Sequence, residues 1–308
     1  RVLSKPSSMA NLRAALQEIF SPEEAPQTAA ASMKPQYEAL KDRQILVVDD
    51  NEINLKLMTM LLSEQGARVT RASDGTEAIN LAVEYPFDLI LMDIHMPHIK
   101  GTDAARQIRE RARHNKHIPI VALTADIVPK TRDEAMAAGM DGYLLKPLNL
   151  PHLWSILLPL LDGKPPPTPG DSQAMQTASK QDQTDLPIRD MELSLSITGG
   201  NPQLAEELIE QLLGELSQHQ ARIRELYNAA RWQEMADAVH RLHGATSVCG
   251  VPALDAVVSA LEACCRAAEH TGIEALMEKF EHAAGQLFKS RRSCATPTAV
   301  FTAENKIP

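Results

Sequence analysis

Short apolar runs alternate with helical patterns five times between residues 41 and 162. The runs are nearly continuous in Val, Ile and Leu, which is typical of strands buried on both faces of a parallel sheet. The alternation therefore predicts an α/β domain of the flavodoxin-like, doubly wound class with a five-stranded parallel sheet. The expected strands cover 44–50, 67–73, 87–93, 117–125 and 142–147, and the expected helices cover 52–65, 74–85, 101–112, 129–138 and 150–161.

The later part of the chain shows helical patterns and no strand signal. Asn201 followed by Pro202 favours a helix start, because Asn caps free backbone N–H groups and Pro fits the first turn. Amphipathic segments with short connections then predict an all-α, antiparallel four-helix bundle. The expected helices run through 202–226, 232–246, 252–261 and 273–287.

Two stretches divide the chain. Residues 21–36 and 163–185 contain no Val, Ile, Leu or aromatic residue, so neither can bury enough surface to offset the entropy of ordering. We expect a linker over 21–40, an α/β domain over 41–162, a Pro/Ser/Gln-rich linker over 163–187, a helical bundle over 188–292 and a disordered tail over 293–308.

Charge and cysteine content limit the partners. The 308 residues carry 31 Lys and Arg against 40 Asp and Glu, a net charge of −9, which argues against direct contact with nucleic acid or a polybasic membrane anchor. The longest uncharged run, Pro147–Leu161, is too short for a membrane span and contains prolines. The cysteines show no CxxC spacing and indicate reduced thiols of a cytoplasmic protein. They are Cys249, Cys264, Cys265 and Cys294.

Polar residues gather at the carboxyl ends of the expected strands, the edge where α/β sheets bind ligands. Asp49, Asp50 and Asp93 belong to neighbouring strands in this topology, so their carboxylates converge and raise one another's pKa. A hard divalent cation such as Mg²⁺ relieves that repulsion. Thr124 and Lys146 end or follow two further strands and suit the oxygens of a phosphoryl group. Phosphoryl transfer needs little beyond such positioning and charge neutralisation.

The second expected bundle helix carries His240 off its apolar stripe. His240 lies about 100° from Val239 and about 200° from Leu242 around the helix, so it is expected to point out of the core. His243 and Gly244 follow on the same face. A glycine inside a helix costs about 1 kcal/mol relative to Ala, and its benefit would be room for another molecule to approach His240. On spacing alone, a surface histidine beside a helix-packing glycine is the simpler interpretation.

The α/β domain resembles the receiver domain of two-component signalling through VVDDNEIN, LILMDIHMP, ALTA and YLLKP. The resemblance implies that Asp93 is the phospho-acceptor. It also implies that Asp50 and Asp93 bind Mg²⁺ together with the backbone carbonyl of His95, while Asp49 acts through water.

The same resemblance assigns Thr124 and Lys146 to the phosphoryl oxygens and places Tyr143 at an aromatic switch position; a packed strand aromatic is the alternative for Tyr143. The imidazoles of His95 and His98 lie in a Pro-Gly loop and are expected to be solvated rather than metal ligands.

Residues 1–20 repeat the end of the α/β domain. Lys5-Pro6 is followed by the same helical spacing that follows Lys146-Pro147. We interpret this segment as the tail of an upstream receiver-like domain.

The segment HRLHGATSVCGVPAL resembles the signature of histidine phosphotransfer (HPt) domains, His-x-x-Lys-Gly. By this resemblance His240 is a phospho-acceptor. His243 stands where Lys is usual, so the charge that assists His240 depends on pH.

Together the two domains resemble the C-terminal receiver plus HPt region of bacterial hybrid sensor histidine kinases of the BarA/GacS type. The resemblance implies a two-component phosphorelay that runs from an upstream kinase histidine to Asp93, then to His240, then to a separate response regulator. The parent protein is expected to be anchored in the inner membrane by an upstream segment, with no membrane contact by this one. We find no ATP-binding glycine motif, so this chain is not expected to phosphorylate itself from ATP.

Two other functions fit parts of the pattern. A receiver-controlled helical adaptor needs no phosphotransfer by His240. A Mg²⁺-dependent phosphatase would use the acidic site alone, and release of phosphate without labelling of His240 would favour it.

Overall fold

The structure of the chain is a computed structural model, and it describes residues 40–124, 129–146, 148, 150–165, 186–267, 270 and 272–294. The expectations for residues 1–20, for most of both linkers and for the end of the chain fall outside these residues. Among the helices of the described ranges, none is long and apolar enough to span a membrane.

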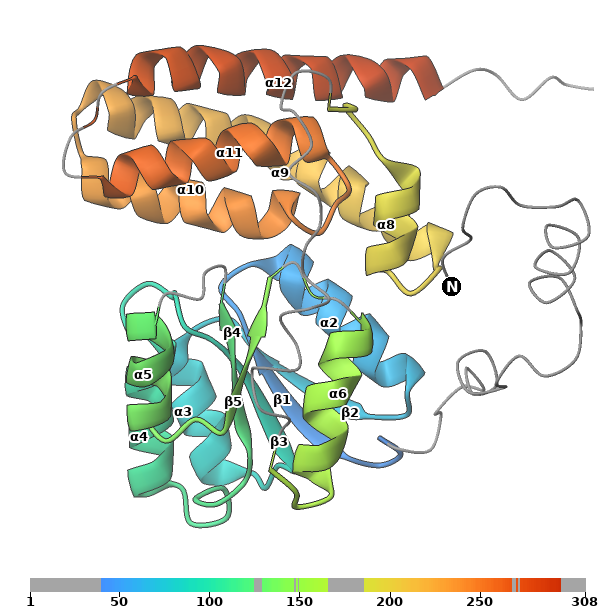
Figure 1. Ribbon diagram of the computed structural model, residues 1–308, viewed down its shortest axis with the longest axis vertical. Coiled ribbons are helices and arrows are strands. Elements are labelled where there is room, and N and C mark those ends of the chain that lie inside the picture. The colour runs from blue at the N-terminus through green and yellow to red at the C-terminus, as the bar shows by residue number, and fades with distance from the viewer. Residues whose placement is uncertain are drawn as a thin grey trace, which may run out of the picture.

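The first domain contains a parallel five-stranded sheet of order β2-β1-β3-β4-β5 (Figure 1). This confirms the expected doubly wound class. The observed strands are shorter than the apolar runs, because the backbone hydrogen bonds between neighbouring strands cover only part of each run. The strands are β1 (Gln44–Val48), β2 (Arg68–Ala72), β3 (Leu89–Asp93), β4 (Ile120–Thr124) and β5 (Gly142–Leu145).

Helices cover both faces of this sheet, because alternate strand residues point to opposite sides. Val47 packs with residues of α2 and α6 on one face, and Val48 packs with residues of α3 and α4 on the other. The side chains of Asn51 and Asp74 cap α2 and α3 by accepting backbone N–H bonds. The helices are α2 (Glu52–Glu64), α3 (Gly75–Glu84), α4 (Gly101–Arg111), α5 (Pro129–Ala137) and α6 (Leu150–Leu161).

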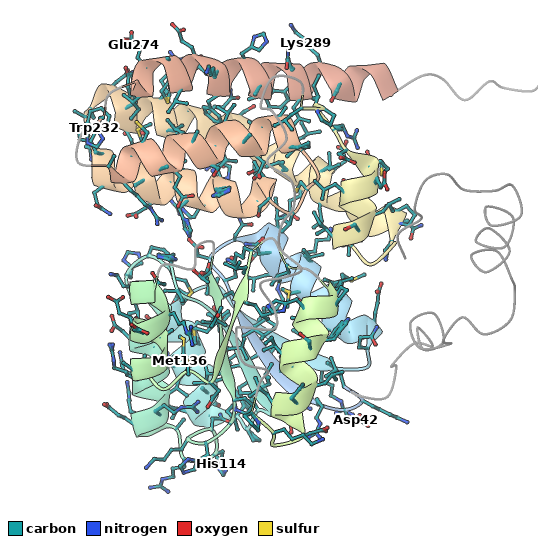
Figure 2. The ribbon with its side chains drawn as sticks, in the orientation of Figure 1. Asp42, His114, Met136, Trp232, Glu274 and Lys289 are labelled. Carbon is teal, nitrogen blue, oxygen red and sulfur yellow. The ribbon has the colours of Figure 1, made fainter. Side chains whose placement is uncertain are left out.

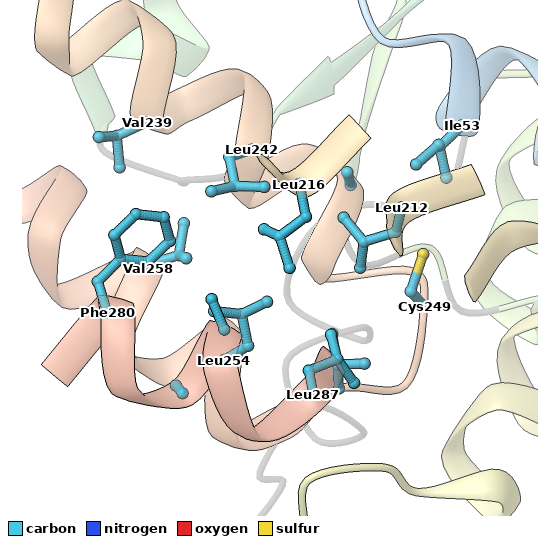
Figure 3. Close-up of a cluster of buried hydrophobic side chains, with 14 of the residues drawn as sticks. Ile53, Leu212, Leu216, Val239, Leu242, Cys249, Leu254, Val258, Phe280 and Leu287 are labelled. Carbon is cyan, nitrogen blue, oxygen red and sulfur yellow. The ribbon is translucent and has the colours of Figure 1, made fainter. Parts of the chain in front are cut away.

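The second domain is a bundle of four long helices with one short helix before them. The long helices are the expected ones, and their apolar stripes meet in one core in which Phe280, Val258 and Leu216 are completely or almost completely buried (Figure 3). The sequence pattern did not reveal α8, because seven residues are too short to show a helical period. The helices are α8 (Met191–Ile197), α9 (Pro202–Asn228), α10 (Trp232–Thr246), α11 (Pro252–Arg266) and α12 (Ile273–Cys294).

A glycine allows α8 to pack on the turn between α10 and α11. Gly250 has a φ of 62°, and a Cβ there would lie 2.0 Å from the hydroxyl oxygen of Ser194. The backbone N–H of Asp190 donates to the carbonyl of Gly250 at 2.8 Å. Any larger residue at Gly250 would therefore push α8 away from the bundle.

The bundle lies over the carboxyl ends of the strands, and α2 makes much of the contact (Figure 1). Three α2 side chains, Ile53, Leu57 and Leu61, belong to the buried core of the bundle. Lys56 and Glu207 form an ion pair of 2.6 Å beside them. Burying a side chain such as Leu57 contributes about 1.5–3 kcal/mol, and a partly exposed ion pair contributes about 0–1 kcal/mol, so the apolar side chains stabilise this contact more than the ion pair does.

The outer ends of both domains lie away from this contact. Figure 2 shows Asp42 and His114 at the end of the α/β domain farthest from the bundle. It also shows Glu274 and Lys289 on α12, on the side of the bundle that faces away from the sheet. The contact between the domains lies at the strand ends and involves α2, α9 and α10.

Candidate functional site

Three carboxylates meet where β1 and β3 end. Asp49 and Asp50 follow β1 and Asp93 ends β3, and these neighbouring strands pair Val48 with Met92. One oxygen from each of the three acids lies within 4.8 Å of the others. The side chains thus converge as the strand order requires.

Burial and mutual repulsion change how these acids titrate. Burial, followed by the charges of Asp93 and Asp49, raises the pKa of Asp50 to about 7. Burial also raises the pKa of Asp49. Burial alone would raise the pKa of Asp93, but the charge and hydrogen bond of Lys146 hold it below the ordinary value. The two acids that follow β1 are therefore harder to ionise than ordinary carboxyl groups.

Lys146 lies between two of the acids. Its ammonium donates to Oδ2 of Asp49 and to Oδ2 of Asp93, each at 2.7 Å. The backbone N–H of Lys146 donates to the carbonyl of Thr124, a buried residue at the end of β4. The strand ends thus bring the predicted Lys146 to the acids and join its backbone to Thr124.

Asn54 is a site residue that sequence reasoning missed. Its side-chain amide donates to both oxygens of Asp49, at 3.1 and 3.2 Å, from the first turn of α2. The backbone N–H of Asn51 donates to the same carboxylate at 3.0 Å. These donors hold Asp49 in place. The sequence signal for Asn54 was its position five residues after Asp49, because that spacing brings the first turn of α2 back to the end of β1.

The acidic cluster has the donor set of a hard cation. Oδ2 of Asp50 is buried and makes no hydrogen bond within the described residues. Carboxylate oxygens are the ligands that Mg²⁺ prefers. The unpartnered oxygen and the raised pKa of Asp50 both indicate space for such a charge, so the residues fit the expected ion.

His240 of α10 faces this cluster across the domain interface. Its ring faces the α/β domain, as expected for a residue off the apolar stripe, and because that domain covers it the residue is only 9% exposed. A cavity of about 20 Å³ lies between the domains and is lined by the three acids, Lys146 and His240. That volume admits about one water-sized group. The phospho-acceptors predicted in the two domains therefore border the same cavity.

Glu262 of α11 orients the imidazole of His240. Nδ1 of His240 lies 2.7 Å from one carboxylate oxygen, and Nδ1 of His243 lies 2.6 Å from the other. Burial alone would raise the pKa of Glu262, but the hydrogen bonds from both histidines hold it far below its ordinary value. An ionised Glu262 accepts both bonds, so each Nδ1 carries a proton and Nε2 of His240 is left for chemistry.

The sequence carried one signal for Glu262 that was not used. Val258 and Leu261 lie on the buried stripe of α11, and Glu262 is four residues after Val258 on the same face. An acid where the stripe requires an apolar residue indicates a buried partner. The histidines are 19 and 22 residues away on another helix, so no local spacing could identify them.

Both regions of the chain match described families. Residues 45–158 match the response regulator receiver domain, and residues 207–290 match the Hpt domain. The chain carries a receiver domain followed by an Hpt domain. Two such domains in one chain imply a phosphorelay, with the acidic cluster at the receiver active site.

The relatives are hybrid sensor kinases, as the motifs predicted. The chain is 32% identical over 299 residues to the sensor histidine kinase GacS of Pseudomonas protegens, which covers 95% of this chain and 31% of that protein. It is 30% identical over 220 residues to the signal transduction histidine-protein kinase BarA of Escherichia coli K12, which covers 71% and 23%. The chain thus spans less than a third of the length of these relatives.

Solved receiver domains are similar over the first domain. The receiver domain of the sensor histidine kinase PA1611 from Pseudomonas aeruginosa, crystallised with a magnesium ion in its active-site cleft, is 36% identical. That match covers 39% of this chain and 98% of that one, with a TM-score of 0.37. The receiver domain of the histidine kinase CKI1 from Arabidopsis thaliana with Mg²⁺ and BeF₃⁻ is 32% identical, covers 42% and 95%, and has a TM-score of 0.37.

His95 of the receiver corrects one expectation. Its ring was expected to be solvated, but it packs edge-on against His240 with ring centroids 5.1 Å apart. Its Nδ1 is buried and without a hydrogen-bond partner in the described residues. Burial, followed by the charge of His240, lowers the pKa of His95 to about 4. The expectation failed because the Hpt domain covers this loop; His98, three residues on, is exposed as expected.

Gly244 of the Hpt domain gives the room that its position in α10 predicted. A Cβ on Gly244 would lie 3.1 Å from the amide nitrogen of Asn54 and 3.6 Å from that of Asn51. The amide of Asn51 donates to the carbonyl of Arg241 at 2.7 Å. The start of α2 therefore lies directly against α10, and the molecule that approaches His240 is the chain's own receiver.

Proposed function

We propose that this chain is the transfer segment of a phosphorelay. Asp93 accepts a phosphoryl group from an upstream kinase histidine and passes it to His240, which donates it to a separate response regulator. The observation that carries the proposal is the cavity shared by Asp93, Lys146 and His240. An adaptor that used the Hpt domain only as a binding surface would have no need to place the imidazole and the acids around one cavity.

The residues of this chain supply most of what the transfer needs. The Asp93 carboxylate attacks the incoming phosphorus, and the bond from phosphorus to the kinase histidine breaks. Lys146 neutralises the developing charge. Asp50, Asp93 and the backbone carbonyl of His95, with Asp49 through water, would hold Mg²⁺, and the bound ion would supply further neutralisation of the phosphoryl oxygens. Thr124 ends β4 beside this group, where a hydroxyl suits a phosphoryl oxygen.

The second step uses the pair formed by His240 and Glu262. The lone pair of Nε2 attacks phosphorus, and the bond from phosphorus to Asp93 breaks and returns its electron pair to the carboxylate. The ring becomes positively charged and keeps its proton on Nδ1, where the ionised Glu262 stabilises it. The total charge is unchanged by this step: Asp93 is a carboxylate again, and the phosphoryl group has moved from its oxygen to the nitrogen of a positively charged ring.

Donation to a response regulator requires a change of arrangement. His240 is covered by the receiver, and Asn54 of α2 lies against Gly244 beside it. A second receiver that takes the phosphoryl group must reach the same imidazole, so the internal receiver must first move away. We include a cytoplasmic location in this proposal, and the described cysteines Cys249, Cys264 and Cys265 form no disulfide.

Labelling with acetyl phosphate and Mg²⁺ tests the function. The wild-type chain should carry base-labile phosphate on Asp93 and acid-labile phosphate on His240. Asp93→Asn should lose both, and His240→Gln should keep only the base-labile label. EDTA should prevent both. Release of free phosphate from a wild-type chain that never carries acid-labile label would overturn the relay and favour a phosphatase.

A further inference from the structure

Arg241 follows the proposed phospho-acceptor of the Hpt domain and contacts the receiver twice. Its carbonyl accepts a hydrogen bond from the amide of Asn51 at 2.7 Å. Its guanidinium Nε lies 4.0 Å from Oδ2 of Asp50. The main chain of Arg241 thus helps hold the two domains together, while its side chain brings a positive charge to the acidic cluster.

Asp50 is the acid that the receiver's own lysine does not engage. Lys146 donates to Asp49 and Asp93, whereas Oδ2 of Asp50 is buried without a hydrogen bond in the described part of the chain. Three carboxylates facing one lysine leave an excess of negative charge, which opposes an anionic phosphoryl group. Arg241 reduces that excess, and it does so from the other domain.

The side chain of Arg241 also has room to move. It borders a groove of about 510 Å³ that reaches both Asp50 and His240, and it is 45% exposed. A guanidinium remains charged at every physiological pH and offers two parallel donors to phosphoryl oxygens. A small shift of the Arg241 side chain along the groove would therefore move its guanidinium from Asp50 towards a phosphoryl group in transfer.

We propose that Arg241 is a positioning residue for the internal transfer step, and that its charge offsets Asp50 and the phosphoryl group as the group passes from Asp93 to His240. This rests on the phosphorelay proposed above. Arg241 exchanges no proton and forms no covalent bond. In the step that it assists, the oxygen–phosphorus bond at Asp93 breaks and the nitrogen–phosphorus bond at His240 forms. The role exists only while the domains are docked.

The test separates the effect of charge from that of side-chain shape at position 241, in the chain that carries both domains. Arg241→Gln removes the charge and Arg241→Lys keeps it, while every variant retains the main-chain carbonyl that accepts from Asn51. After labelling with acetyl phosphate and Mg²⁺, the rate at which acid-labile label forms is measured relative to the amount of base-labile label present. A unit charge at 4.0 Å from Asp50, screened by partial exposure, predicts about tenfold slower transfer in Arg241→Gln, with most of the rate recovered in Arg241→Lys.

A second readout is the affinity for Mg²⁺ alone, measured by titration calorimetry. Removing a positive charge beside Asp50 should tighten Mg²⁺ binding by about threefold or more in Arg241→Gln and leave it near wild type in Arg241→Lys. Arg222→Ala is the matched control, since Arg222 borders the same groove and is 43% exposed but pairs with Glu225 and Glu234.

The role of charge would be overturned if Arg241→Gln transferred at the wild-type rate, or if Arg241→Gln and Arg241→Lys slowed transfer equally. Slowing by Arg222→Ala as strong as that by Arg241→Gln would show a general effect of the groove and would also overturn it. Absence of acid-labile label in the wild-type chain would instead overturn the phosphorelay itself.

Discussion

Nδ1 of His240 and Oε1 of Glu262 lie 2.7 Å apart, and the second oxygen of the same carboxylate lies 2.6 Å from Nδ1 of His243. One buried acid on α11 therefore fixes two imidazoles on successive turns of α10. The arrangement selects the tautomer of His240 whose Nε2 is free, and it places a negative charge where the phosphorylated ring becomes positive.

Replacing Glu262 by Gln should slow transfer to His240 more than it weakens the fold. A hydrogen bond to a charged group is worth about 1.5–3 kcal/mol, so we expect acid-labile label to form roughly 10- to 100-fold more slowly. Glu234→Gln is the control, because Glu234 is an acid near the start of α10 whose ion pairs are with arginines. Equal rates in the wild type and Glu262→Gln would contradict the orienting role, provided both melt near the same temperature.

His243 should make the stability of the bundle depend on pH. Burial alone would lower the pKa of His243, but the hydrogen bond to Glu262 and the charges of Asp255 and Glu262 raise it above the ordinary 6.5. A raised pKa in the folded state gives stability that is complete below 6.5 and disappears as the pH rises through the raised value. Unfolding of the wild type and of His243→Gln is the measurement, and the difference between them should shrink on the alkaline side. A constant difference would show that packing, not charge, sets the contribution.

The same histidine also bears on transfer. His243→Gln should slow transfer to His240 without abolishing it, because His243 borders the cavity but its Nδ1 is bound to Glu262. His243→Lys should be tolerated and should help most above the pH at which the imidazole loses its proton. Loss of all transfer in His243→Gln, with normal transfer in His240→Gln, would show that the two histidines have been assigned the wrong way round.

Lys146→Met should make the fold depend on divalent cations. The substitution leaves Asp49 and Asp93 without their shared ammonium, so the three acids repel one another more strongly. Labelling of Asp93 should be lost, and Mg²⁺ should raise the melting temperature of the variant by more than it raises that of the wild type. Thermal unfolding with Mg²⁺ and with EDTA measures this, and an equal shift in both proteins would show that the cation does not bind among these acids.

The acids and the lysine of the receiver site were predictable, and the contacts between the domains were not. Asp49, Asp93 and Lys146 follow from strand order alone, because the carboxyl ends of parallel strands share one edge. His95 depends on what covers its loop, and the Hpt domain covers it. Glu262 depends on how α11 packs against α10, which no spacing along the chain reports. The helix periods likewise predicted the long helices and not α8, whose position depends on Gly250.

Gly244→Ala should stabilise the bundle and weaken the relay. Alanine is favoured over glycine in a helix by about 1 kcal/mol, but its Cβ would lie 3.1 Å from the amide of Asn54, which must give way. Gly214→Ala in α9 is the matched control, because a Cβ there meets nothing within 4 Å. Both variants should melt higher than the wild type, and only Gly244→Ala should transfer more slowly. Equal transfer rates in the two variants would contradict the steric role of Gly244. Gly244→Leu extends the test to a side chain that cannot fit.

Leu57→Asp should separate the two domains, whereas Lys56→Glu should have little effect. Leu57 is 1% exposed and belongs to the buried cluster of the bundle although it lies on α2 of the receiver. Burying a carboxylate there without a partner costs several kcal/mol. The neighbouring ion pair of Lys56 and Glu207 is partly exposed, and such pairs contribute about 0–1 kcal/mol. Hydrogen exchange of the amides around His240 measures the docking.

The separation should act on the two steps of the relay in opposite directions. Transfer from Asp93 to His240 within Leu57→Asp should slow, because the acceptor is no longer held beside the acids. Donation from a phosphorylated His240 to a separate receiver should quicken, because the face around Gly244 is no longer covered. If the amides around His240 lose protection and donation to the separate receiver is unchanged, the internal receiver does not compete for that face, and its movement is not the step that limits donation.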